Sequence, residues 1–308
     1  MPQADSDSAS IRLLTLAQLS ARGSWQLELA HDRAESLLIW LTRGQGLALM
    51  DGVRRGIGAH NALFIPAGTV MSIELGRQGF GQALCIRDTS GLNLPRTPVH
   101  LRTREAPAQM ELNGLLDAMM REQVAGRAML DTAMAAHAAL ISVWLHRQID
   151  RVGPEILPDT PSVRLMRAFM ARIVQPDAEM ISLEEHAAVI GVTPTHLARV
   201  SKAETGRTAA ALITERRLHR ARSLLAETET PIQDIARQLG FASAAYFTRF
   251  IQQHCGIGPS ALRRNPARPL PGPTPAISAA TTATAAPPAP QLIRARVAFG
   301  PGSDESKR

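Results

Sequence analysis

The sequence has few cysteines, few aromatic residues and no long apolar run, and each shortage argues against a class of protein. Two cysteines, Cys85 and Cys255, occur in 308 residues. They offer no disulfide framework, which is typical of a reducing compartment. No apolar stretch approaches the roughly 18–20 residues that a membrane-spanning helix needs. The first ten residues lack the basic and apolar segments of a signal peptide. We therefore expect a cytoplasmic location and no membrane partner.

Motifs of enzyme active sites are scarce as well. His31, His60 and His100 have no histidine two or four residues away, whereas a catalytic metal usually needs three protein ligands. The sequence contains neither a Gly-rich phosphate loop nor a Gly-x-Ser-x-Gly elbow. We therefore expect no catalytic residues, no metal and no cofactor, in a protein that is not an enzyme.

Charge is distributed unevenly along the chain, whose formal net charge is +7. Residues 1–160 hold 15 Lys and Arg against 16 Asp and Glu, a net of −1. Residues 161–264 hold 14 against 9, a net of +5, and residues 265–308 hold 5 against 2, a net of +3. The positive excess therefore lies in the C-terminal half and favours a polyanionic partner there, although many basic faces are merely solvated.

Residues 25–87 show the pattern of short strands separated by turns. Trp25, Leu27 and Leu29 alternate with polar residues, which predicts a half-buried strand. The apolar run Leu37–Leu41 predicts a more buried strand, and Asp51-Gly52 predicts a hairpin turn. Further short apolar segments lie at 47–50, 63–65, 73–75 and 83–86. Short strands at this spacing favour a small barrel or sandwich.

The period changes to that of helices from about residue 108. Two helices are expected, joined near Gly126. A proline-rich segment follows, then helical patterns, then a stretch rich in Pro, Ala and Thr. The expected organisation is a disordered N-terminus at 1–10, a strand-rich domain with helices at 11–152, a linker at 153–161, a helical domain at 162–264 and a disordered tail at 265–308.

Three helix starts in the helical domain carry local signatures. Ser182–Glu185 fits a capping box, and Thr193–Pro194 fits an N-cap followed by proline at the first helical position. Thr230–Pro231 is predicted to repeat that arrangement. Such caps are worth about 1 kcal/mol each, so they indicate where helices begin.

These starts define two helix-turn-helix units, at about 182–203 and 231–254. In the first, a helix ends at Gly191 and a second helix begins at Pro194. In the second, Gly240 ends a helix whose apolar face contains Ile235, and another helix begins near Ala244. One long helix at 209–226 lies between the units. The second helix of such a unit enters the DNA major groove.

This pattern resembles the AraC family of transcription regulators over about 100 residues. Its departures include Ser201, where the family usually has an aromatic residue and where a hydroxyl would need a partner. The matching segments are Ser182–Ala187 through Lys202–Gly206, Arg217-Leu218, Arg220-Ala221, Ile235-Ala236, Leu239–Phe241, Phe247, Arg249 and Gly256–Ser260.

The resemblance implies two recognition helices that enter successive major grooves about 34 Å apart. Arginine can bind guanine with two hydrogen bonds, whereas alanine can only contact a thymine methyl group. Each arginine could instead be a solvated surface residue, and the single tyrosine could be a packing residue. The DNA-contacting positions implied by the family are Thr195, His196, Ala198 and Arg199 in the first unit, and Ala244, Ala245, Tyr246 and Arg249 in the second.

The strand-rich half resembles the cupin-like sensor domains that often precede this module. The expected fold is thus a multidomain α+β chain, with a cupin-like β-barrel followed by helices and an all-α domain of two helix-turn-helix units. A small-molecule effector could bind among Trp25, Trp40 and Phe64, although core packing is the commoner fate of such residues. The helices at 110–150 could form a homodimer surface or pack on their own barrel.

The resulting expectation is a sequence-specific regulator of transcription that binds double-stranded DNA at the nucleoid. Responsiveness to an effector, activation and contact with RNA polymerase follow from the resemblance alone. An enzyme with a helical appendage and an RNA-binding or structural protein are the competing classes. The absence of interleaved surface aromatic residues argues against single-strand stacking.

Overall fold

The computed structural model describes residues 10–76, 78–153, 159–175, 178 and 181–269. The chain divides into two units, residues 1–272 and residues 273–308, and all described residues belong to the first unit. Disorder was expected at residues 1–10 and 265–308, of which 1–9 and 270–308 lie outside the described residues, whereas residues 10 and 265–269 are described.

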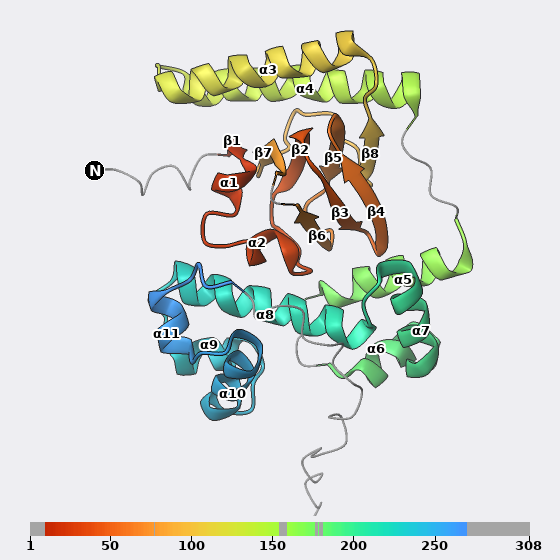
Figure 1. The fold of residues 1–308 in the computed structure, drawn as a ribbon, viewed down its shortest axis with the longest axis vertical. Helices are drawn as coiled ribbons and strands as arrows, with labels where there is room; N and C mark the ends of the chain where they lie inside the picture. Colours follow the sequence, from red (N-terminus) through yellow and green to blue (C-terminus); the bar gives the residue numbers. More distant parts are fainter. Residues whose placement is uncertain (1–9, 77, 154–158, 176–177, 179–180, 270–308) are drawn as a thin grey trace, which may run out of the picture. The chain divides into compact units, whose positions relative to one another are not determined.

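The described strands form two antiparallel sheets (Figure 1). A five-stranded sheet has the order β1-β7-β2-β5-β8, and a three-stranded sheet has the order β4-β3-β6. They do not join into a closed barrel, so the expected domain is confirmed as strand-rich and antiparallel but not as a closed barrel. The strands are β1 (Ile11–Thr15), β2 (Ser36–Arg43), β3 (Gln45–Met50), β4 (Val53–Gly58), β5 (Asn61–Ile65), β6 (Met71–Leu75), β7 (Phe80–Ile86) and β8 (Val99–Arg102).

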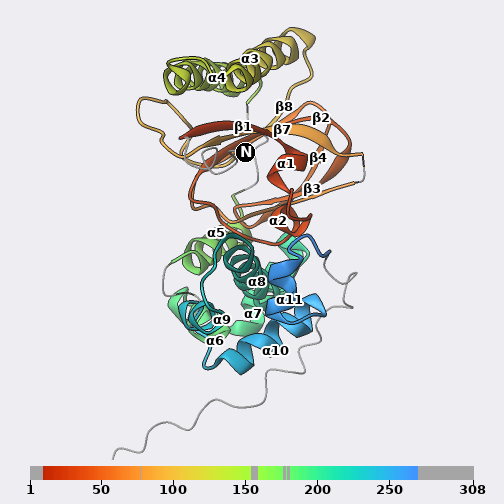
Figure 2. The same ribbon diagram turned by 90° about the vertical axis from the view of Figure 1, so that its left-hand side faces the viewer.

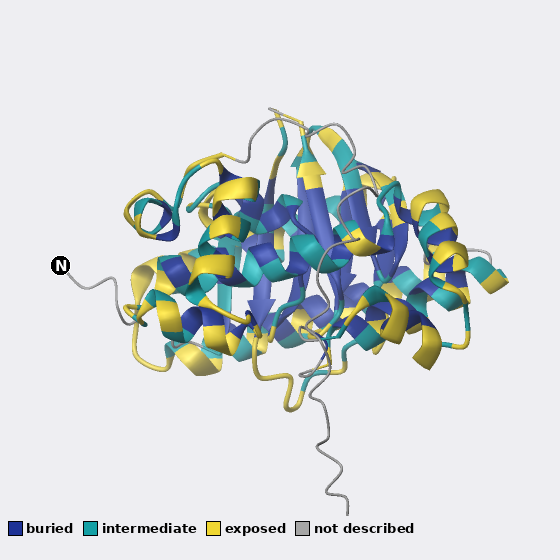
Figure 3. Cartoon of the chain, turned by 90° about the horizontal axis from the view of Figure 1, so that it is seen from below, coloured by how far each residue is buried: buried dark blue, intermediate teal, exposed yellow. Residues whose placement is uncertain are grey.

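The central strand β2 is buried on both faces, which explains its continuous apolar run. Leu37 and Ile39 belong to the core between the two sheets. Leu38 and Trp40 belong to a second core, on the opposite face of the five-stranded sheet. Successive side chains of a strand point to opposite faces, so a strand between two cores needs apolar residues at every position. Figure 3 shows these strands as the buried centre of the chain.

The hairpin predicted at Asp51-Gly52 is confirmed. The two residues join β3 to β4 with φ values of 50° and 80°. Positive φ at both central positions is what a two-residue type I′ turn requires, and Asp-Gly is one of its preferred pairs. This local signal therefore determines the register of the three-stranded sheet, in which Met50 pairs with Val53.

The strand predicted around Trp25–Leu29 is wrong. Residues Trp25–Glu28 form a short helix, α2, which follows the equally short α1 (Leu16–Leu19). Trp25 and Leu27 are both buried, although they lie on one helical turn. A window of five residues cannot distinguish the apolar-polar alternation of a strand from a single helical turn. Here the apolar residues alternate because the short helix is buried on two sides.

Two long helices cover the outer face of the five-stranded sheet (Figures 1 and 2). They are α3 (Ala106–Ala125) and α4 (Leu130–Val152), and α3 ends at Gly126 in the left-handed conformation as expected. Their apolar stripes enter the same core as Trp40. Of the two alternatives for these stripes, packing on their own domain is therefore the observed one.

From Pro161 onward, all helices and strands of the described chain are helices, which loops connect. Helix α5 begins at Pro161, where the expected linker ends, and Thr160 caps it by accepting a hydrogen bond from the Val163 amide at 3.2 Å. The remaining helices are α6 (Leu183–Val189), α7 (Pro194–Thr205), α8 (Ala209–Glu227), α9 (Ile232–Gln238), α10 (Ala244–Cys255) and α11 (Pro259–Arg264). Helix α5 itself spans Pro161–Ile173. No described helix is long and apolar enough to span a membrane.

Candidate DNA-binding interface

Helices α7 and α10 begin and end in the same way. The hydroxyl of Thr193 accepts a hydrogen bond from the His196 amide, and that of Ser243 accepts one from the Tyr246 amide, both at 3.2 Å. Each helix ends at a glycine in the left-handed conformation, where a residue with a Cβ atom would be strained. The predicted second helix of each helix-turn-helix unit is thus confirmed, and the two helices share the same kind of cap at both ends.

Their partner helices differ in how they start. The capping box predicted at Ser182 and Glu185 is present at the start of α6, and the hydrogen bond from the Ser182 amide lowers the pKa of Glu185. At α9 the predicted cap is wrong, because Pro231 itself is the N-cap residue and Thr230 makes no capping bond. The carbonyl of Pro231 instead accepts hydrogen bonds from Asp234 and Ile235.

Helix α8 joins the two units through two separate cores. Its first half contributes Ala209 and Leu212 to the core that holds α5 and α7. Its second half contributes Leu218, Ala221 and Leu225 to the core that holds α9 and α10. Figure 1 shows α8 extending between the two units. A continuous helix that is packed at both ends fixes the separation of α7 and α10.

The predicted DNA-contacting residues gather at the N-terminal turns of these two helices. The exposed residues are Thr195, His196 and Arg199 on α7 and Ala245, Tyr246 and Arg249 on α10, while Ala198 and Ala244 are half-buried. Leu197 and Phe247 lie on the opposite faces and are completely buried. Each helix therefore packs by one face and leaves its predicted reading face free among the described residues.

Two contacts orient side chains on these reading faces. Arg199 lies 3.3 Å from Nδ1 of His196, one turn earlier on α7. The ring of Tyr246 is 59% exposed and contacts Phe241, with 5.9 Å between the centroids. Tyr246 thus packs against Phe241 and remains more than half exposed, and its contact with DNA stays a prediction.

Ser201 has the partner that its position requires. It is completely buried, and its hydroxyl donates a hydrogen bond of 2.8 Å to the carbonyl of Arg207. Thr205 donates to the same carbonyl at 3.0 Å. Buried hydroxyl groups are costly only when they lack a partner, so the replacement of an aromatic residue here leaves no unsatisfied group.

Contacts between the strand-rich half and the helical half were not foreseen from the sequence. Arg216 donates to Asp32 at 2.7 Å, and the amide of Ala30 donates to Glu215 at 3.0 Å. Arg207 forms ion pairs with Glu215, at 2.6 Å, and with Glu74. The only available signal was the density of arginines on α8, which cannot indicate partners almost 200 positions away.

The three residues predicted to line an effector pocket lie in two different places. Trp40 and Phe64 share the core between the five-stranded sheet and helices α3 and α4. Trp25 lies instead in the core of the second helix-turn-helix unit. Within the described residues, no group of three His, Cys, Asp or Glu side chains could hold a metal ion.

Two stacked histidines lie where the halves meet. The rings of His31 and His219 are parallel, with 3.9 Å between centroids. Burial, and secondly Arg33, lower the pKa of His31 to about 3, and burial with the neighbouring His31 lowers that of His219 well below 6.5. Nδ1 of His31 donates to the carbonyl of Leu29 at 2.8 Å. Both rings are therefore neutral in the folded chain at neutral pH.

This pair makes stability depend on pH. Because the unfolded chain has histidine pKa values near 6.5, it binds protons on these two histidines as the pH falls below 6.5, whereas the folded chain does not. The free energy of unfolding should therefore be highest above pH 6.5 and fall towards pH 3, by up to about 1.4 kcal/mol per pH unit for each histidine. Urea unfolding at pH 7.0 and 5.5 measures the slope. His31→Gln should reduce it, and an unchanged slope would contradict the assignment.

Comparison with known proteins agrees with this arrangement of helices. Residues 186–265 match the family described as Helix-turn-helix domain. The Proteus vulgaris protein named Probable transcription factor PqrA is 35% identical over 91 residues, which are 30% of this chain and 75% of that protein. The Right origin-binding protein of Escherichia coli K12 is 38% identical over 86 residues, 28% of this chain and 30% of that protein. The chain thus covers under a third of the latter's length.

A solved structure is also similar to part of this chain. The C-terminal domain of AraT, a response regulator from Geobacillus stearothermophilus, has 30% sequence identity over 37% of this chain and 92% of its own, with a TM-score of 0.31. The family assignment rests on the sequence matches, and the family match at residues 186–265 contains α7, α8 and α10. With these matches and the two helix-turn-helix units in place, the chain belongs to the AraC-type family of DNA-binding transcription regulators.

Proposed function

We propose that this protein reads one DNA operator with α7 and α10 together and that its strand-rich, cupin-like half makes this binding responsive to an effector. The observation that carries the proposal is the pair of equally capped helices, each with an exposed N-terminal face, held by one continuous α8. Helices of this kind dock into major grooves one helical turn apart. We propose DNA contact by Thr195, His196, Ala198, Arg199, Ala244, Ala245, Tyr246 and Arg249.

The two reading faces differ in what they can recognise. On α7, Arg199 can bind guanine with two hydrogen bonds, and Thr195 can donate to or accept from a base edge. On α10, Ala244 and Ala245 can offer only apolar contact, so Arg249 is the main source of base discrimination there. Tyr246 presents a hydroxyl suited to a phosphate oxygen. The first unit should therefore specify more base pairs than the second.

Replacing either arginine should weaken specific binding without unfolding the chain. Arg199→Ala and Arg249→Ala should each reduce operator affinity by about 5–150-fold, which corresponds to the 1–3 kcal/mol of one bidentate base contact. Selection from random duplexes, followed by gel-shift titration, measures the effect and the relaxed base pair. Arg147→Ala, which removes the same charge from an exposed position on α4, is the control. A base preference identical to that of the parent would remove the tested arginine from the reading set.

Binding should also weaken steeply with salt. Arginines that neutralise phosphates release condensed counterions, so the logarithm of the affinity should fall linearly with the logarithm of the salt concentration. Six phosphate contacts would give a slope of about −5. Titrations at several salt concentrations measure it, and the Arg147→Ala variant should keep the parental slope. A flat dependence would argue against groove docking.

The regulatory properties extend this proposal. Residues of the strand-rich half share cores with both helix-turn-helix units, so a ligand that shifts one half can alter the other.

The outer faces of α3 and α4 expose Met110, Val124, Leu140 and Val143, and we propose them as a homodimer surface. We also propose that the protein acts at the nucleoid, in the cytoplasm, and that it activates transcription through contact with RNA polymerase. Operator-linked reporter expression with and without the chain distinguishes activation from repression.

A further inference from the structure

Arg207 lies in the short turn that connects the first recognition helix, α7, to the long helix α8. It stands between Gly206, the left-handed residue that ends α7, and Thr208, the N-cap residue of α8. The carbonyl of Arg207 accepts hydrogen bonds from the hydroxyls of Ser201, at 2.8 Å, and Thr205, at 3.0 Å, and both of these residues belong to α7. The backbone of Arg207 is therefore tied to the recognition helix.

The side chain of Arg207 connects that turn to three other elements. Its Nη1 donates to Glu215 on α8 at 2.6 Å, and its Nη2 forms an ion pair with Glu74 on β6. Nη2 also donates to the carbonyl of Glu28 on α2, at 3.3 Å. The side chain is only 19% exposed, so these contacts are screened less than those of a surface ion pair. A planar guanidinium group can hold several acceptors in fixed directions at once.

Glu215 binds donors from both halves of the chain. Its carboxylate accepts a hydrogen bond from Arg207 and another from the amide of Ala30, at 3.0 Å. Burial raises the pKa of Glu215, and the charge of Arg207 opposes that shift. Loss of the guanidinium group would leave a buried carboxylate with the Ala30 amide as its remaining donor among the described residues, which is unfavourable. The position of the turn after α7 therefore depends on Arg207.

A second contact brings the strand-rich half against the same helix-turn-helix unit. Asp51, in the hairpin between β3 and β4, forms an ion pair with Arg167 on α5 at 3.2 Å. A Cβ atom at the neighbouring Gly52 would lie 2.8 Å from the Cβ atom of Met166, so the hairpin backbone touches α5 directly. Helices α5 and α7 share one core. The strand-rich half thus contacts the first unit at α5 as well as at Arg207.

We propose that Arg207 is a positioning residue for DNA recognition, which fixes the direction of α7 relative to α10 by holding the end of α7 to α8 and to the strand-rich half. The residues proposed for DNA contact on α7 lie in its N-terminal half, whereas Arg207 follows its C-terminal end. The role of Arg207 rests on the proposed reading of one operator by both helices.

The distance between the two half-sites of the operator reveals whether the recognition helices are held in a fixed relation. A DNA duplex turns once in about 10–10.5 base pairs, so two inserted base pairs rotate one half-site by about 70° relative to the other. Two recognition helices in a fixed relation should bind the altered spacing poorly. Helices that can reorient should tolerate it.

Gel-shift titration of the full chain on two duplexes tests this role. One duplex carries the operator selected by the parent, and the other carries the same half-sites with two base pairs inserted between them. We expect the parent to prefer the first duplex at least tenfold and Arg207→Ala to lower this ratio at least threefold. Arg207→Lys keeps the charge but loses the forked donor group, so it should restore the ratio only in part.

The ratio separates positioning from other effects of the same substitution. Loss of a phosphate contact or of overall stability weakens binding to both duplexes equally and leaves the ratio unchanged. Ile141→Val, in the core beneath α4, is the control for reduced stability, and Arg147→Ala is the control for lost charge. Both should keep the parental ratio. If Arg207→Ala also keeps it, the positioning role is overturned.

Glu74→Gln isolates the contribution of the strand-rich half. Glu74 is 48% exposed, so this variant should fold as the parent does, and its Arg207 keeps the ion pair with Glu215. We expect its spacing ratio to lie between those of the parent and Arg207→Ala. A parental ratio would overturn the link to the strand-rich half and leave the link to α8. A parent that binds both duplexes equally would overturn the joint reading proposed above, and the role of Arg207 with it.

Discussion

Ile235→Asp should unfold the second helix-turn-helix unit and abolish operator binding. Ile235 is completely buried, in a core that also contains Phe247 and Leu218. An aspartate there loses the apolar contacts and buries a charge without a partner, which together cost about 3–5 kcal/mol. That core holds α10 against α8, so the second recognition helix should lose its position. Urea unfolding followed by circular dichroism measures the loss of stability, and gel-shift titration measures the loss of binding.

Matched variants on the same helix α9 make this result specific. Gln233→Asp introduces the same residue at an exposed position and should change stability by about 0.5 kcal/mol or less. Ile235→Val removes one methyl group and should cost about 1 kcal/mol. If Ile235→Asp retained both helicity and operator binding, the assignment of this residue to the core would be wrong.

Trp25→Ala should destabilise the chain by a similar amount, although Trp25 lies far from the helical half in sequence. Its indole N–H donates to the carbonyls of Arg22, at 2.7 Å, and Pro266, at 3.0 Å. The guanidinium of Arg222 lies over the ring, 4.6 Å from its centroid. Removing a completely buried tryptophan costs about 3–5 kcal/mol, and here it also leaves the guanidinium without its aromatic partner.

The conservative change divides this effect between packing and hydrogen bonding. Trp25→Phe keeps an aromatic ring beneath Arg222 but cannot donate to Pro266, so it should lose much less stability than Trp25→Ala. Urea midpoints of the three chains provide the comparison. Equal midpoints for Trp25→Ala and the parent would contradict the packing of Trp25 in this core. If Trp25→Phe lost as much stability as Trp25→Ala, the stabilisation by Trp25 would come from its hydrogen bonds.

Local signals in the sequence were reliable wherever the structure depends on neighbouring residues. The capping box at Ser182, the cap at Thr193 and the turn at Asp51-Gly52 all act within four residues, and all are present. The cap expected at Thr230 failed for an equally local reason, because the extended backbone of Pro231 allows it to act as the N-cap itself.

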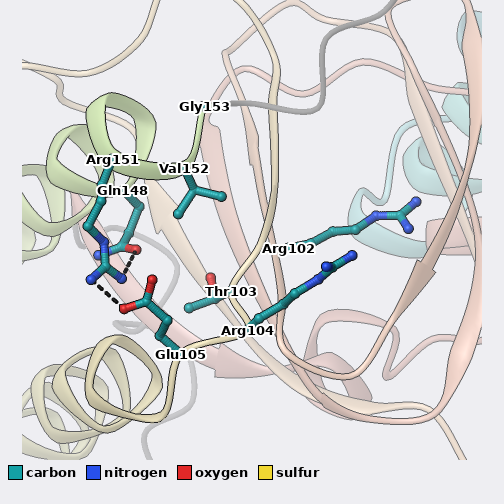
Figure 4. Close-up of a pocket in the computed structure, with 8 residues that line it drawn as sticks. All are labelled: Arg102, Thr103, Arg104, Glu105, Gln148, Arg151, Val152 and Gly153. Atoms are coloured by element: carbon teal, nitrogen blue, oxygen red, sulfur yellow. Dashed lines mark hydrogen bonds and ion pairs between the residues drawn. The ribbon is translucent and has the colours of Figure 1, made fainter.

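Signals that depend on distant partners were weaker. Strands β1 and β8 lie at the edges of the five-stranded sheet and were not foreseen, because a short edge strand acquires its hydrogen bonds from a partner elsewhere in the chain. A cavity bordered by Arg102, Thr103 and Arg104 and by the end of α4 (Figure 4) gave no signal in the sequence either, because it exists only where α4 approaches the end of β8.

The sequence by itself determined the helix-turn-helix pair and its family, and it predicted which residues we propose for DNA contact, because helix caps, turn glycines and the 3.6-residue period are encoded locally. The tertiary structure alone decided that the strands form two sheets, that Trp25 belongs to the helical half and that Arg102, Thr103 and Arg104 border one cavity. Each of those outcomes depends on contacts between residues far apart in the chain, and no local pattern specifies which distant partner a buried side chain will meet.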